Sequence, residues 1–168
     1  DVYKRQGGNV SPMILERLSR EPYRLTMRRG SARIGTVPDA VQVGPKVCLI
    51  NKYSASDGDL FPWDFRALGL GKLIGTRTWG GIVGISGSLP YMDGTDIRVP
   101  FFTSFDPKTG SWIIENHGVD PDILIDNDPV KEWNGEDQQL DRAIQEVMKE
   151  LQNRKPLPGV PTPRDFSK

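Results

Sequence analysis

The sequence has little that would tie it to a metal, a membrane or a nucleic acid. Its 168 residues include one cysteine and one histidine, which excludes an internal disulfide and a cysteine-cluster metal site. Lys+Arg and Asp+Glu both number 22, and no basic stripe with interleaved aromatics indicates nucleic acid. No apolar run approaches the roughly 20 residues of a membrane helix, and no apolar segment near residue 1 predicts a signal peptide. We therefore expect no metal, no organic cofactor, and neither nucleic acid nor membrane as a partner.

What the chain does have is enough apolar residues for a core. Hydrophobic residues make up 36% of the sequence, which suits one ordinary domain or a fragment of something larger. Cys48 lies inside the apolar run 47–50, where we expect a buried structural thiol.

The order of predicted elements indicates an α/β fold. Ser11 and Pro12 predict the start of a helix, with Ser11 as its N-cap. An apolar strand at 47–50, a helix at 60–68 and a strand at 72–77 then form a predicted parallel β-α-β crossover. Residue 56 would lie at the carboxyl end of the first strand, the end at which active sites are usually found in such units.

The second half of the chain is predicted to contain more strands. Asp93-Gly94 indicates a tight turn before a strand at 97–102, and a further strand is expected at 111–115. Residues 20–44 are charged and lack periodicity, which predicts a long surface excursion. The segment 155–168 is rich in proline and is predicted to be an extended tail.

An amphipathic helix is predicted over 136–151, with an apolar face that we expect to pack on the core. That face consists of Leu140, Ile144, Val147, Met148 and Leu151.

The most informative segment is Ser56-Asp57-Gly58-Asp59, between the apolar strand and the following helix. A serine at such a junction can be held exposed while free N–H groups of the first helical turn stabilise an oxyanion beside it. The alternative is that Ser56 caps the helix, and on this tetrapeptide alone capping is favoured. Carboxylates are stabilised near a helix N-terminus, so we expect structural roles for the side chains of Asp57 and Asp59.

Other motifs stand in a fixed order around this segment. They are Gly-Gly-Asn-Val-Ser at 7–11, Gly-Thr-Arg-Thr-Trp-Gly-Gly at 75–81 and Glu-Asn-His-Gly-Val-Asp-Pro-Asp at 115–122. Together they strongly resemble the core protease domain of the tricorn peptidases, which are S41-type serine proteases. The resemblance implies the α/β sandwich shared with ClpP-like and crotonase-like proteins, with residues 7–154 as the second half of the catalytic core.

The resemblance also implies roles for individual residues. Ser56 corresponds to the nucleophile, and the backbone amides of Asp57 and of Gly7 or Gly8 correspond to the two oxyanion donors. Glu115 corresponds to the last member of a Ser-His-Ser-Glu tetrad. The histidine of that tetrad and its neighbouring serine belong to a preceding core domain of the family, so this chain is expected to carry half of an active site and to be inactive alone.

The substrate cleft is the remaining part of the expected site. Trp79, Gly80 and Gly81, with Gly58, are expected to line it, because glycines let an extended peptide approach the backbone. For Trp79, packing in the core is an equally weighted alternative.

Two bases within the chain could replace the histidine of the tetrad. If the strand at 111–115 continued, Glu115 and His117 would point to the same face, which would allow a local triad with Ser56. The family's motif does not use this histidine, and Gly118 indicates a turn, so a surface role is favoured. Related carboxyl-terminal processing proteases use a lysine on the next strand, but Gly81 stands at that position. Lys72 is expected to be solvated at the start of its strand.

The first six residues depart from the family's pattern, which is approximately Asp-Val-Arg-Gly-Asn-Gly-Gly-Gly. Here the sequence is Asp-Val-Tyr-Lys-Arg-Gln before Gly7-Gly8. We therefore expect residues 1–6 to be a non-native or truncated start.

The resulting prediction is a serine endopeptidase that acts on peptides through an acyl-enzyme at Ser56. Two alternatives remain: a non-catalytic peptide-binding or scaffolding module that retains the fold, and a crotonase-like acyl-CoA enzyme, which is weakened by the lack of a phosphate or adenine site. The resemblance implies a homohexamer for the intact protein and a cytoplasmic location, with a periplasmic or exported one as the alternative.

Overall fold

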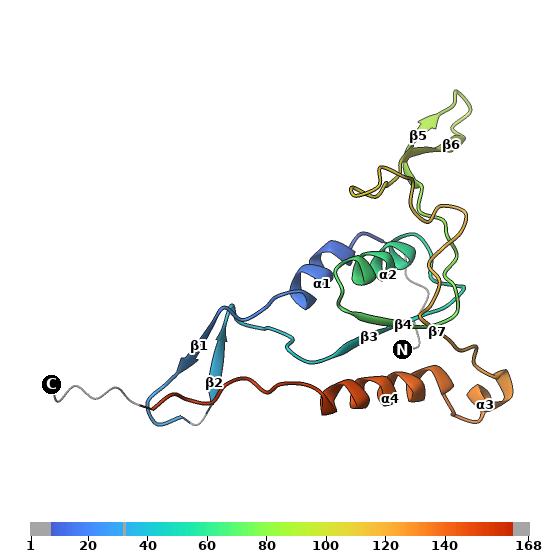
Figure 1. Cartoon of the computed structure of the whole chain (residues 1–168). Helices are drawn as coiled ribbons and strands as arrows, with labels where there is room; N and C mark the ends of the chain where they lie inside the picture. The colour runs from blue at the N-terminus through green and yellow to red at the C-terminus, as the bar shows by residue number, and fades with distance from the viewer. Residues whose placement is uncertain (1–7, 32, 163–168) are drawn as a thin grey trace.

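The computed structural model describes residues 8–31 and 33–162 and has a three-stranded parallel sheet at its centre (Figure 1). The sheet order is β3-β4-β7, formed by Lys46–Ile50, Gly71–Gly75 and Ile123–Leu124. The register pairs Lys46 with Gly71 and Ile50 with Gly75. The predicted β-α-β crossover is thereby confirmed, and β7, which is too short to give a sequence signal, joins on the far side of β4.

Helices cover both faces of this sheet. The connecting helix α2 (Asp57–Ala67) lies on one face beside α1 (Ser11–Leu18), and α4 (Gln138–Gln152) lies on the other (Figure 1). The short helix α3 (Pro129–Trp133) precedes α4. The mixed α/β fold expected from the sequence is therefore confirmed. Its core is a cluster of apolar side chains between the sheet, α1, α2 and the loops above them: Leu15, Ile50, Phe65, Leu73, Ile82, Ile114 and Val119.

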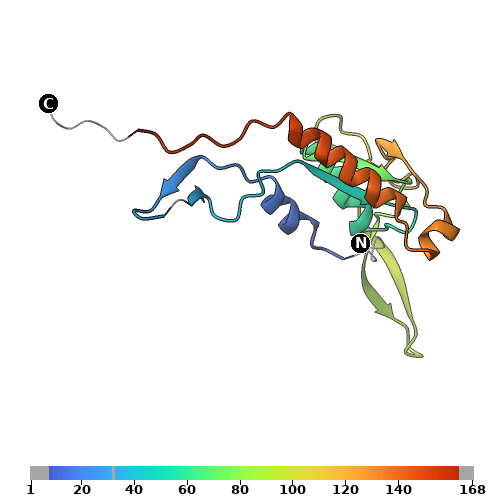
Figure 2. The ribbon, with the colours of Figure 1, turned by 90° about the horizontal axis from the view of Figure 1, so that it is seen from below.

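Two antiparallel hairpins extend away from the sheet in both views (Figures 1 and 2). The first pairs β1 (Arg24–Met27) with β2 (Ile34–Val37) inside the predicted surface excursion. The second pairs β5 (Gly84–Pro90) with β6 (Asp96–Phe102) around the predicted Asp93-Gly94 turn. All residues of β6 are exposed. Residues 153–162 contain no helix or strand beyond the turn that ends α4, in agreement with the extended tail expected there.

Two local predictions are wrong at the N-terminal helix and the last strand. Ser11 is the first residue of α1 and not its N-cap; Val10 takes the cap position without a side-chain cap. Residues 111–115 do not form a strand, because a single bridge between Phe105 and Trp112 is followed at once by a turn. Asn116 at φ 60° is what turns the chain there.

The apolar face of α4 does not pack on the core, which overturns the prediction for this helix. Its buried residues are Gln139, Ala143 and Glu146. Leu140, Ile144, Met148 and Leu151 are 41% to 55% exposed, and Val147 is half-buried. The chain as a whole exposes 12798 Å², whereas a compact monomer of 18.8 kDa exposes about 8,300 Å². The apolar face of α4 is part of this exposed surface.

Cys48 is free and half-buried. Burial raises the pKa of its thiol to about 12, so the thiol stays protonated and unreactive at neutral pH.

The buried carboxylate of Glu146 predicts an acid-sensitive contact between α4 and the sheet. It accepts hydrogen bonds from Lys72 (2.7 Å) and Arg142 (2.6 Å), and the bond from Lys72 is the main reason that its pKa is lowered from 4.5. A lowered folded-state pKa stabilises the fold above pH 4.5, and this stabilisation is lost as the pH falls through the lowered value. As the pH is lowered from about 6 to about 3, the melting temperature of Glu146→Gln should fall less than that of wild type. Exposed Glu136→Gln is the control and should behave like wild type. Equal losses in wild type and Glu146→Gln would contradict this assignment.

Candidate functional site

Ser56 lies between β3 and α2 in a backbone conformation that non-glycine residues rarely adopt. Its φ is 56° and its ψ is −116°, a region that costs of order 1–3 kcal/mol and persists only where the surroundings impose it. Ser56 is exposed, and its side chain makes no cap hydrogen bond. The capping interpretation is therefore wrong. Among the described residues Ser56 Oγ has no hydrogen-bond partner.

The backbone around Ser56 leaves one donor free. The Ser56 N–H donates to the carbonyl of Gly81 at 3.1 Å, and the Ser56 carbonyl accepts from Asp59 and Leu60 at 2.8 and 3.0 Å. The buried Gly58 donates to Ala55 at 2.8 Å. By contrast, the N–H of Asp57 has no acceptor in the described part of the chain. A free amide thus directly follows the exposed hydroxyl, at the N-terminus of a helix, where donors favour negative charge.

Asp59 explains how the loop opposite Ser56 is held in place. Its side chain is fully buried, and its two oxygens accept from the N–H groups of Gly80 (2.7 Å) and Gly81 (3.2 Å). Because the Gly81 carbonyl in turn accepts from Ser56, the Asp59 carboxylate fixes the segment that holds the backbone of Ser56.

The same loop is packed against the Glu115 turn. Gly80 has φ 88°, and a Cβ at this position would lie 2.4 Å from the nitrogen of Gly118. The Gly80 carbonyl accepts from Asn116 at 2.7 Å. Buried Thr78 makes two further hydrogen bonds with Val119. Thr78 Oγ1 accepts from the Val119 N–H (2.8 Å), and the Thr78 N–H donates to the Val119 carbonyl (3.1 Å). The loops 78–81 and 116–119 therefore form one unit.

Glu115 is anchored through one of its two carboxylate oxygens. Oε2 accepts from the N–H groups of Ile82 (2.7 Å) and Val83 (3.0 Å). Oε1 has no partner among the described residues, which leaves it able to accept one more hydrogen bond.

Trp79 is exposed beside this loop. Its side chain is 66% exposed, so the core-packing alternative is wrong. The backbone N–H of Trp79 donates to the Ser54 carbonyl at 2.9 Å. A Cβ on Gly81 would lie 2.1 Å from the indole ring, so the ring covers Gly81, whose carbonyl accepts from Ser56. The indole therefore forms an aromatic surface close to Ser56.

The segment expected to supply the second oxyanion donor is only partly described. Gly8 is exposed with φ 136°, whereas Gly7 and the predicted non-native residues 1–6 lie outside the described residues. Two positions after Gly8, the N–H of Val10 donates to Asp57 Oδ2 at 3.0 Å. The Gly8 segment and the Ser56 segment are therefore directly connected.

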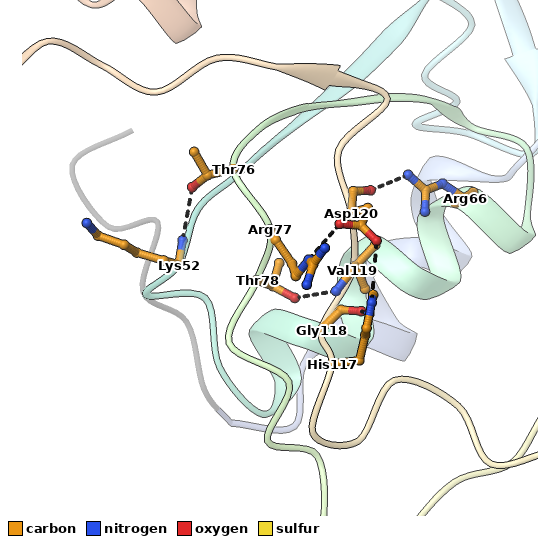
Figure 3. Close-up of polar contacts among 9 residues, drawn as sticks. All are labelled: Lys52, Arg66, Thr76, Arg77, Thr78, His117, Gly118, Val119 and Asp120. Carbon is orange, nitrogen blue, oxygen red and sulfur yellow. Dashed lines mark hydrogen bonds and ion pairs between the residues drawn. The ribbon is translucent and has the colours of Figure 1, made fainter.

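His117 does not form a local triad with Ser56 and Glu115. It lies in the turn after Glu115 and not on a continuing strand. Its Nδ1 lies 2.9 Å from the Gly118 carbonyl, and its Nε2 is 3.7 Å from Asp120. Figure 3 shows the ring beside Asp120, which also receives Arg77 at 2.6 Å. The exposed histidine belongs to this ion-pair network.

Lys72 is also unavailable as a base. Its ammonium group donates to Glu146 at 2.7 Å, and this bond raises the pKa of Lys72 above 10.5. No group of three potential metal-ligating side chains occurs among the described residues. Within the same part of the chain, no helix is long and apolar enough to cross a membrane.

Sequence reasoning missed the carboxylate contacts that hold this site together. Asp59 was expected to interact with its own helix, but its partners lie 21 residues away. Thr78 was not singled out either. No spacing pattern in the sequence relates these residues to their partners.

Comparison with known proteins identifies relatives over most of the chain. The model of peptidase family S41 matches residues 1–125. The tricorn protease of Thermoplasma volcanium is 42% identical over 158 residues, which are 92% of this chain and 15% of that protein. Tricorn protease homolog 1 of Streptomyces coelicolor is 39% identical over 144 residues, 86% of this chain and 13% of that protein. A crystal structure of the tricorn protease matches with a TM-score of 0.79 and 40% identity, over 88% of this chain and 14% of that one. The chain thus spans about one seventh of the length of these relatives.

Proposed function

The chain belongs to peptidase family S41, and we propose that it carries the nucleophile-bearing half of a serine endopeptidase active site. The single observation that carries this proposal is the geometry of Ser56: an exposed hydroxyl without a partner among the described residues, at φ 56°, followed by the free N–H of Asp57. Strained backbone at a strand-to-helix turn is how nucleophilic serines are presented in other hydrolases.

In the proposed reaction, Ser56 Oγ attacks the carbonyl carbon of the scissile peptide bond. Its proton passes to a histidine supplied by a part of the protein outside residues 1–168. The carbonyl oxygen becomes an oxyanion, which accepts from the N–H of Asp57 and from that of Gly7 or Gly8. Collapse of this intermediate transfers the proton to the leaving amine and leaves an acyl-enzyme on Ser56. Water, which gives a proton to the histidine, then attacks the ester. The acyl group leaves as a carboxylic acid, and the histidine returns the proton to Ser56 Oγ.

Two features support a base from outside this chain. Ser56 Oγ and Glu115 Oε1 both have no partner among the described residues. In the predicted tetrad, a serine hydroxyl donates a hydrogen bond to the carboxylate of Glu115, and a histidine ring accepts one from Ser56 Oγ. The two oxygens without partners can form these bonds. The uncovered apolar surface of α4 further supports a second region of protein packed on this chain.

The proposed substrates are peptides in extended conformation. The exposed indole of Trp79, which covers Gly81, offers an apolar wall for one substrate side chain. Gly80 is packed against the 116–119 loop, so the lining of the cleft by Gly80 and Gly81 stays a prediction. Gly58 is buried and its N–H already donates to Ala55, so its part in the cleft stays a prediction. For the intact protein we propose a homohexamer, as the resemblance to tricorn peptidases implies.

The proposal can be tested with a fluorophosphonate probe on the full-length protein. We expect labelling of Ser56, located by peptide mass mapping, and its loss in Ser56→Ala. Absence of a label in a well-folded full-length protein would favour the peptide-binding module instead.

A variant of His117 tests where the base comes from. Because this ring is held by the Asp120 network, His117→Ala is expected to change kcat/KM by less than about threefold, whereas loss of a catalytic base costs at least about 10³. The comparison is made with Asp120→Ala, which disturbs the same network. A large loss in His117→Ala alone would show that the base is local.

A further inference from the structure

The carboxylate of Asp57 bonds to the start of a different helix from its own. Oδ2 accepts from the N–H groups of Val10 (3.0 Å) and Ser11 (3.2 Å). In return, Ser11 Oγ donates to the Asp57 carbonyl at 3.2 Å. Asp57 and Ser11 are 6% and 2% exposed, so water does not compete for these bonds. Because α1 has no side-chain cap of its own, Asp57 serves as its cap from 46 residues away.

These three bonds join the two segments that carry the proposed oxyanion donors. One donor is the N–H of Asp57 itself, and the other is proposed for Gly7 or Gly8. Of these two, Gly8 is described and lies two positions before Val10. Two donors stabilise an oxyanion only when both point to the same oxygen, and catalytic groups must be held to within about 0.5 Å. Among the described residues, no other hydrogen bond joins residues 8–11 to residues 56–58.

We propose that the Asp57 carboxylate is a positioning residue that sets the two oxyanion donors at the correct separation. Asp57 would thus act twice, through its N–H on the substrate oxygen and through its carboxylate on the opposite donor segment. This inference rests on the proposed function. It goes beyond the structural role expected for this side chain, because it predicts an effect on the transition state and not on folding alone.

The role of the Asp57 carboxylate can be separated from that of the Asp57 N–H, because Asp57→Ala removes the carboxylate and keeps the backbone N–H. If the Gly7-Gly8 segment moves away, the enzyme loses the equivalent of one oxyanion donor, which costs about 10²–10³ in rate. A donor used only in the transition state lowers kcat and leaves KM nearly unchanged. Affinity for a peptide aldehyde, which forms a tetrahedral adduct, should fall in parallel, while affinity for a product peptide should not.

The experiment uses the full-length protein with kcat expressed per fluorophosphonate-titrated site. We expect Asp57→Ala to lower kcat about 10²-fold with KM within about threefold of wild type. Asp57→Asn keeps an acceptor oxygen, and is expected to recover most of the loss; Ser11→Ala removes only one bond and should have a smaller effect. The control is Asp64→Ala, an acidic residue of the same helix whose side chain makes no hydrogen bond among the described residues.

The possible outcomes separate this inference from the proposed function. If wild type cleaves peptides in a Ser56-dependent manner but Asp57→Ala retains kcat per site, only the positioning role is wrong. An equal loss in Asp64→Ala, or unchanged aldehyde affinity, also overturns it. Should Asp57→Ala fail to fold, Ser11→Ala must still lower kcat measurably without raising KM, and Asp57→Asn must retain most of the wild-type kcat. If Ser56→Ala remains active, the proposed function itself fails and this inference with it.

Discussion

Replacing Ser56 by alanine in the full-length protein is expected to lower kcat for peptide hydrolysis by about 10⁴–10⁶-fold, as for other serine nucleophiles. The hydroxyl is exposed, and no other serine follows a strand at positive φ among the described residues. The backbone donors and Trp79 remain in Ser56→Ala, so KM should change little. Steady-state hydrolysis of a chromogenic peptide measures the effect. Exposed Ser111→Ala is the matched control and should be fully active.

A glycine at the same position separates chemistry from backbone strain. Ser56→Gly is expected to be equally inactive, but it removes the cost of holding a side chain at φ 56°. Thermal unfolding should therefore show Ser56→Gly to be more stable than Ser56→Ala by about 1 kcal/mol. If alanine is the more stable of the two, the strain assigned to this position is wrong.

Replacing Asp59 by alanine is expected to have the next largest effect, on both stability and activity. The N–H groups of buried Gly80 and half-buried Gly81 would lose their acceptors, at a cost of about 1–3 kcal/mol for the buried one. The Gly81 carbonyl, which holds the backbone of Ser56, would also be released. A misplaced nucleophile typically costs about 10² in rate, so we expect kcat to fall at least by this factor.

The Asp59 prediction is checked by thermal unfolding and by kcat per titrated site. Asp59→Asn keeps one acceptor oxygen and should fall between wild type and Asp59→Ala. Asp106→Ala, in an exposed turn closed by its own carboxylate, controls for loss of an aspartate elsewhere. Wild-type kcat and stability in Asp59→Ala would show that this carboxylate does not hold the loop.

The parts of the fold predicted from the sequence are those with local causes. The β3-α2-β4 unit follows from the apolar runs at 47–50 and 72–77 and the helical segment between them, and the β5–β6 turn follows from Asp93-Gly94. The strand expected at 111–115 failed because long-range contacts decide that segment: Asn116 bonds to Gly80 and turns the chain.

The α4 prediction failed for a different reason. Periodicity locates an apolar face but does not say what that face contacts. In this helix the sheet is met by Ala143 and by the paired carboxylate of Glu146, and the apolar stripe points elsewhere. The expected location of the helix was nonetheless within two residues of the observed one.

Around Ser56, the sequence located the residues but not the bonds that organise them. The order of motifs placed Ser56, the Gly8 segment, Trp79 and Glu115 in one expected site. Three carboxylates, those of Asp57, Asp59 and Glu115, each accept from two successive backbone amides. Such contacts join segments 21 to 47 residues apart, and nothing in local composition indicates them.

Trapping the acyl-enzyme tests directly whether Ser56 is the nucleophile. The full-length protein is mixed with an activated peptide ester, quenched in acid within milliseconds, and digested for peptide mass mapping. We expect one acyl group per subunit on the peptide that contains Ser56, and none in Ser56→Ala. Hydrolysis that proceeds with no acyl group on Ser56, or with the group on another residue, would contradict it.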